Sequence, residues 1–182
     1  AGARGSAALT NAPTLVNGTI YTIAFNGTDA AGNTATQVSV TSITFDTTDP
    51  VISSVSPSTS SSVNTTAVGY TLSEAIASGS VVWTRTSGTA DGNSPHTAAL
   101  AGTELNTGQR ASAVLTNAPT LVSGTIYTIA FNGTDAGGNA ATEVSVTGIT
   151  FDTTAPTIIA STTIASDNST ATVTFSEAVF DT

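Results

Sequence analysis

Residues 115–156 read LTNAPTLVSGTIYTIAFNGTDAGGNAATEVSVTGITFDTTAP, and residues 9–50 read LTNAPTLVNGTIYTIAFNGTDAAGNTATQVSVTSITFDTTDP, an almost identical segment 106 positions earlier. Only six of the 42 paired positions differ. Such fidelity at a long period indicates an array of whole domains, because a solenoid repeat is one supersecondary unit and is much shorter. The repeat period therefore defines the domain organisation before any strand is assigned.

A shorter match sets the phase of the array. YTLSEAI, which starts at Tyr70, returns as VTFSEAV, which starts at Val173. The sequence therefore predicts one complete repeat over residues 51–156. We expect residues 1–50 to be the back part of a preceding repeat, with its last three strands. Residues 157–182 are expected to be the front part of a following repeat, with its first two strands.

The composition and local pattern predict an all-β fold. Thr, Ser, Ala, Gly and Val dominate, and short alternating runs are separated by Gly, Pro, Asn and Asp, as in a β-sandwich. The complete repeat is predicted to have about seven strands, near residues 52–55, 67–72, 80–86, 97–101, 110–115, 125–131 and 143–151. Each repeat is then a sandwich with its own apolar core.

The residue pattern of two strands predicts which side chains face the core. Alternation places Tyr127, Ile129 and Phe131 on one side of their strand. On the last strand, Val146 and Ile149 fall out of phase by one residue, which predicts a β-bulge near positions 147–148. Trp83 and Tyr127 stand where immunoglobulin-type sandwiches place a core tryptophan and a corner tyrosine.

The chain resembles the bacterial Ig-like repeats of surface adhesins, S-layer proteins and other long extracellular stalks. Three motifs carry the resemblance: SEA at residues 73–75 and 176–178, GTIYTIAFNGTDAGGN at 124–139, and FDTTAP at 151–156. The resemblance implies tandem immunoglobulin-like β-sandwiches, an extracellular or cell-surface location, and a spacer or scaffold role repeated along a secreted polypeptide.

Charge and missing residue types exclude several functions. Twelve acids face only three arginines, and the net charge of −9 would repel nucleic acid and anionic lipid, so cations are the favoured partners. The absence of cysteine excludes disulfides and thiol catalysis. No stretch approaches the roughly 20 apolar residues of a membrane span. We therefore expect neither nucleic-acid binding nor membrane insertion of this segment.

Carboxylates are expected to gather at one end of the complete repeat. Because strand direction alternates, that end receives the incoming linker with Asp46 and Asp49, the turn with Glu74, and the loop with Asp135. Calcium takes about six to eight oxygen ligands from such groups, so the sequence predicts a calcium site at the junction. The cadherin-like surface repeats that the chain resembles use junctional calcium in this way.

The next junction offers a weaker version of the same site. Asp152 and Glu177 are its candidate ligands, but Ala155 stands where Asp49 stood. Asp and Asn also dominate turns because they bond to their own backbone, so these residues could equally be turn formers without an ion. Both interpretations stay open at this point.

Catalysis is not expected. The only histidine, His96, falls in a polar loop, where we expect it to be solvated, and the sequence places no serine or acid beside it. The leading interpretation is a structural spacer of a long surface protein, with linkers and calcium limiting its bending. Two alternatives are a subunit of a self-assembling filament, whose ends neighbouring copies complete, and a module that binds glycans or a host protein.

Overall fold

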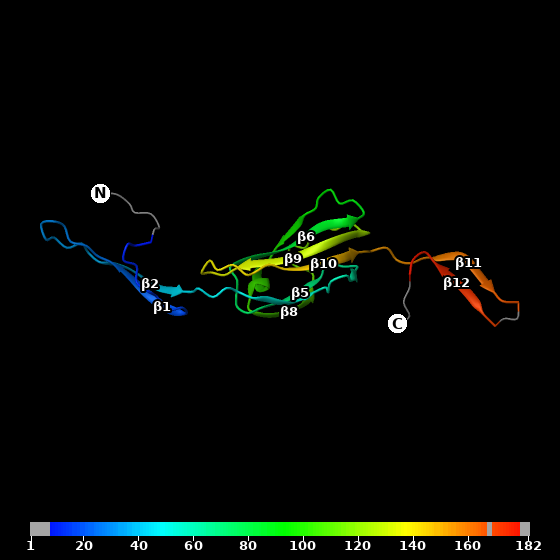
Figure 1. The fold of residues 1–182 in the computed structure, drawn as a ribbon, viewed down its shortest axis with the longest axis horizontal. Coiled ribbons are helices and arrows are strands. Elements are labelled where there is room, and N and C mark those ends of the chain that lie inside the picture. The colour runs from blue at the N-terminus through cyan, green and yellow to red at the C-terminus, as the bar shows by residue number, and fades with distance from the viewer. Residues whose placement is uncertain (1–7, 167–168, 179–182) are drawn as a thin grey trace.

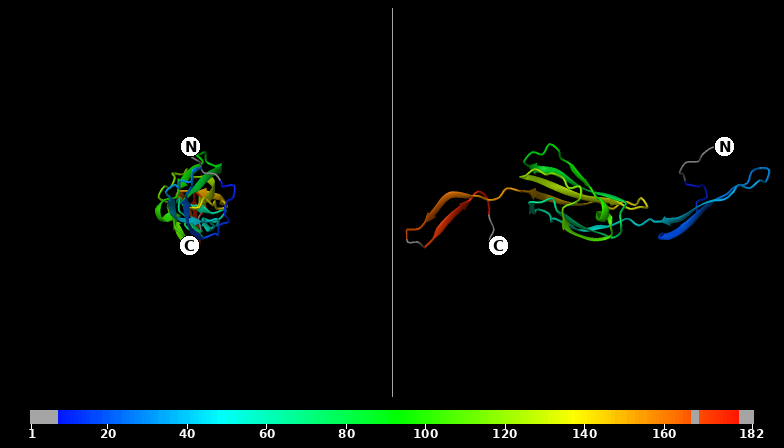
Figure 2. Two further views of the ribbon diagram at one scale, coloured as in Figure 1. Left: turned by 90° about the vertical axis from the view of Figure 1, so that its left-hand side faces the viewer. Right: turned by 180° about the vertical axis from the view of Figure 1, so that it is seen from behind.

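The computed structural model describes residues 8–166 and 169–178, and it is built from three parts in a row. A hairpin of β1 (Thr19–Phe25) and β2 (Val38–Phe45) comes first, a two-sheet body follows, and a hairpin of β11 (Ile158–Ile164) and β12 (Ala171–Phe175) comes last. The three parts lie along one long axis (Figure 1), and the end-on view in Figure 2 superposes them on one another. The three parts therefore follow one another along the molecule in the order of the sequence.

The body is a β-sandwich. One sheet has the order β4-β10-β9-β6-β7 and the other has the order β3-β5-β8. The strand bounds are β3 Ile52–Ser56, β4 Ser62–Val63, β5 Val68–Leu72, β6 Ser78–Gly88, β7 His96–Ala99, β8 Gly108–Ala113, β9 Thr125–Thr134 and β10 Val144–Phe151, with a single 3-10 turn, η1, at Gly102–Leu105. The prediction of an all-β sandwich is confirmed.

All seven strands expected in the complete repeat are present, and the structure adds two details. The strand β7 pairs with β6, so it belongs to the five-stranded sheet. The first strand divides in two: β3 pairs antiparallel with β5, whereas β4 pairs parallel with β10 in the other sheet. A two-residue strand has no alternation to read, which is why β4 could not be predicted.

The core lies between the two sheets, and its residues follow the predicted faces. Alternate residues of β9 are buried, and Tyr127 and Ile129 have no exposed surface. Trp83 is also fully buried, and its ring meets that of Tyr127 edge-on at 6.1 Å. The pairing of β9 with β10 shifts register between Val146 and Ile149, so the predicted bulge is confirmed.

The first hairpin has the same apolar residues as β9 and β10 without the same cover. Ile129 and Ile149 of the sandwich have no exposed surface, but their counterparts Ile23 and Ile43 are 44% and 37% exposed. In the complete repeat, this face of β9 and β10 is covered by the β3-β5-β8 sheet. The sandwich thus shows which strands cover this apolar face when they are present.

Candidate functional site at the junction between repeats

The linker from the first hairpin to the sandwich is hydrogen-bonded to the part that precedes it. The side chain of Asn17 accepts a bond from the backbone nitrogen of Thr47 at 2.7 Å and donates one to the Thr48 hydroxyl at 2.8 Å. The backbone nitrogen of Thr48 also donates to the carboxylate of Asp46 at 2.9 Å. The linker therefore leaves the hairpin in a defined direction.

The same linker is bonded to the part that follows it. The side-chain amide of Asn139 donates to the backbone carbonyl of Asp46 at 3.1 Å, across 93 positions of sequence. The backbone nitrogen of Val51 donates to the Ser73 hydroxyl at 2.8 Å, and Pro50 is fully buried. Since a bend at this linker would break bonds on both sides, the junction is a packed interface and not a free tether.

Three carboxylates meet beside this interface. Asp46 directly follows β2, Glu74 follows β5, and Asp135 follows β9, and each contributes an oxygen to a group whose members lie within 4.8 Å of one another. The structure thus brings together three of the four residues that strand direction placed at this end. Asp49 is exposed in the linker and lies outside the group.

The negative charges of the three clustered carboxylates repel one another. Burial raises the pKa of Glu74, and the negative charges of Asp46, Asp135 and Asp49 raise it further. By contrast, hydrogen bonds from Asn139 hold the pKa of Asp135 below its usual value. Within residues 8–166 and 169–178, no basic side chain forms an ion pair with any of these acids. A hard cation with oxygen preference fits this donor set, because it would remove the mutual repulsion.

The second junction is built differently. Asp152 accepts bonds from the Thr154 backbone at 2.9 Å and the Ser123 hydroxyl at 3.3 Å, and the Thr154 bond holds its pKa below the usual value. Asp152 and Glu177 line the same surface hollow. In the part of the chain that the structure describes, no third acid joins them in a metal-sized group. Ser123 stands here where the first junction has Asn17.

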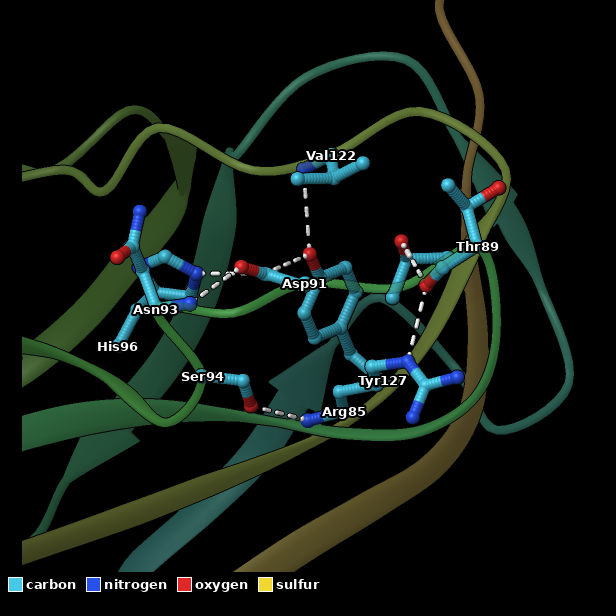
Figure 3. Close-up of polar contacts among 9 residues, drawn as sticks. Arg85, Thr89, Asp91, Asn93, Ser94, His96, Val122 and Tyr127 are labelled. Carbon is cyan, nitrogen blue, oxygen red and sulfur yellow. Dashed lines mark hydrogen bonds and ion pairs between the residues drawn. The ribbon is translucent and has the colours of Figure 1, made fainter.

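The interpretation of His96 as a solvated loop residue is wrong. His96 begins β7, its side chain is only 13% exposed, and its Nε2 lies 2.7 Å from Oδ2 of Asp91. Figure 3 shows Asp91 between His96 and Tyr127, whose hydroxyl donates to the same Oδ2 at 2.6 Å. Residue spacing could not reveal this cluster, because Tyr127 is 36 positions away from Asp91.

The hydrogen bonds of the Asp91 cluster have a structural role. Hydrogen bonds from Tyr127 and His96 lower the pKa of Asp91 to about 2, and burial raises the pKa of Tyr127. The nearby Ser94 hydroxyl accepts a bond from the backbone of Arg85 at 2.7 Å and does not face the histidine as a nucleophile would (Figure 3). The cluster fixes the loop between β6 and β7 to β9.

The two sheets, the buried Trp83 and the corner tyrosine define an immunoglobulin-like β-sandwich. The hydroxyl of Tyr127 accepts a bond from the Val122 backbone at 3.1 Å, five residues upstream, which is the corner arrangement of that class. Residues 46–153 match the family model of the bacterial Ig-like domain, so the chain belongs to that family. Domains of this family occur in bacterial surface proteins and are typically non-catalytic.

Neither a curated protein nor a solved structure matches the chain. Among the residues that the structure describes, no helix has the length and apolar character needed to cross a membrane.

Proposed function

We propose that this chain is a structural spacer of a bacterial surface protein, in which each repeat adds length and each junction resists bending. The observation that carries the proposal is the linker at residues 46–51, which is hydrogen-bonded to the part before it through Asn17 and to the part after it through Asn139 and Ser73. A spacer works by geometry, so no catalytic group is required. The chain is extracellular in this proposal.

We propose further that calcium binds at Asp46, Glu74 and Asp135 and stiffens the first junction. The support is the proximity of the three carboxylates, their origin in three different segments, and the lack of a basic side chain paired with them in the described residues. Calcium there would tie the linker to both the turn after β5 and the loop after β9. Asp152 and Glu177 would form a weaker site at the second junction.

The spacer proposal is tested by measuring the spread of distances across the junction. The chain has no cysteine, so a cysteine pair at exposed Thr44 and Thr97 carries spin labels without background. Pulsed electron paramagnetic resonance on labelled chain diluted into unlabelled chain should give one narrow distance peak. A broad distribution would show a freely bending linker and would refute the proposal.

A second candidate function is self-assembly into a filament, in which the β1–β2 hairpin of one copy is covered by strands of another. The exposed apolar face of that hairpin favours it, since Ile23 and Phe25 are 44% and 57% exposed. Light scattering across a hundredfold range of concentration separates the two candidates. The mass should rise steadily with concentration for a filament and stay that of one chain for a spacer.

A further inference from the structure

The chain contains two copies of the loop that receives the linker. Residues 29–33 join β1 to β2, and residues 135–139 join β9 to β10. Both loops close with a bond from the backbone nitrogen of the aspartate to the carbonyl of the asparagine, at 2.9 Å and 3.0 Å, and Gly32 and Gly138 have φ angles of 91° and 93°. The two loops therefore have the same conformation.

The asparagine side chain is held the same way in both loops. The amide nitrogen of Asn33 donates to Asp29 at 2.8 Å, and that of Asn139 donates to Asp135 at 2.9 Å. Only Asn139 also reaches a linker, through the carbonyl of Asp46. The asparagine is thus positioned by the loop itself, ready for a linker carbonyl.

The tip residue is the one difference between these loops. It is Ala31 in the first and Gly137 in the second. Gly137 is not among the residues with positive φ, so its backbone does not require glycine, and Ala31 shows that alanine fits this loop. A methyl group at Gly137 would lie 2.9 Å from the side-chain nitrogen of Asn139, and 3.2 Å from both the Cβ and the carbonyl oxygen of Asp46. In the first loop, Asn33 keeps its bond to Asp29 beside Ala31, so a loop of this conformation accommodates the methyl group. The contact that the first loop lacks is the one with Asp46 of the linker.

We infer that loop 135–139 is a docking surface for the linker of the preceding repeat, and that the residue at its tip sets how tightly the linker is held. The inference rests on the proposed spacer function and specifies its mechanism. With glycine at position 137, the Asp46 carbonyl reaches the Asn139 amide; with alanine, the linker must move outward and that bond weakens. A linker of this sequence that meets loop 29–33 encounters the methyl group of Ala31, so the junctions in an array of such repeats resist bending to different degrees.

The substitution Gly137→Ala tests the inference in the labelled chain described above, with chelator present so that a cation plays no part. The loss of about one net hydrogen bond should raise the fraction of label pairs outside the wild-type peak about fivefold. The unfolding midpoint of the sandwich, followed by Trp83 fluorescence, should change little, because alanine is already compatible with this loop.

The matched control is the reverse change, Ala31→Gly, in a loop that no linker contacts in the described residues. It should leave the distance distribution as it is in the wild type. An equally narrow distribution for Gly137→Ala would overturn the inference while leaving the spacer proposal intact. If the wild type is itself broad, the spacer proposal fails first, so the two failures are distinguishable.

Discussion

At the scale of single residues, the buried polar groups decide how the sandwich is held together. Asp91 accepts two bonds on one oxygen, from the Tyr127 hydroxyl and from His96, and its side chain is only 1% exposed. Burying a carboxylate is costly unless such donors satisfy it. A loop of small and polar residues is thereby fixed to β9, in which every second residue is buried.

Replacing Tyr127 with phenylalanine should lower the free energy of unfolding of the sandwich by about 1–3 kcal/mol. The change removes one of the donors to the buried Asp91 and the acceptor for the half-buried Val122 backbone, while Asp91 keeps its bonds from His96 and Asn93. Urea unfolding followed by Trp83 fluorescence measures the loss. The matched control is Tyr21→Phe, since the Tyr21 hydroxyl makes the same backbone bond at 2.9 Å in the first hairpin. An equal effect of both changes on this transition would contradict the role given to Asp91.

At the scale of elements, the bulge in β10 keeps both halves of the strand facing the core. Val146 precedes the bulge and Ile149 follows it, and both are buried because the extra residue restores the phase. Gly148 has a φ of 72° there, and the corresponding Ser42 in β2 has a φ of 61°. The first hairpin therefore forms the same bulge with Ser42, for which the left-handed backbone conformation is unfavourable.

The change Gly148→Ser should destabilise the sandwich by about 1 kcal/mol, the cost of left-handed backbone for a residue with a Cβ. It should not unfold the domain, because a methylene at this position would lie 3.4 Å from the nearest side-chain atom, in Ser60, and Ser42 already occupies the equivalent site. Thermal unfolding measures the loss. A large destabilisation would mean that crowding by Ser60, and not backbone conformation, selects glycine.

The sequence was sufficient for the features that repeat or alternate. The 106-residue period, the seven strands, the bulge after Val146 and the burial of Trp83 all follow from patterns that are local or periodic. The strand directions also placed Asp46, Glu74 and Asp135 at the same end of the domain. These inferences need no knowledge of which strands are neighbours across the sheets.

The features that were missed depend on pairing between distant segments. The four residues of β7 do not indicate whether this strand pairs with β6 or with β8. The bond between Tyr127 and Asp91 spans 36 positions, and the one between Asn139 and Asp46 spans 93. One signal could have pointed to the first of these, because a fully buried tyrosine hydroxyl requires a partner, and Asp91 follows β6, a strand that pairs with β9.

At the scale of the whole molecule, the acidic cluster is expected to make the stability of the junction depend on pH and, if the calcium proposal holds, on cations. The pKa of Glu74 is raised by burial and by the neighbouring carboxylates, above its ordinary value of 4.5. A raised carboxyl pKa adds stability below pH 4.5, and that contribution is lost as pH rises through the folded-state pKa. In chelator at neutral pH, ionised Glu74 therefore opposes the packing of the linker, Asp135 and the turn after β5.

The neutral replacement Glu74→Gln should then raise the thermal midpoint by several degrees in chelator at pH 7, and the advantage should vanish at pH 4. Calcium should reverse the order, because an ion bound only to the folded state stabilises the wild type and the variant has lost a charged ligand. Differential scanning calorimetry with calcium and with chelator measures both effects. The matched control is Glu143→Gln, a change that the first repeat already carries at Gln37. If calcium raises all three midpoints alike, the ion acts elsewhere, and the cluster at Asp46, Glu74 and Asp135 serves only to form turns.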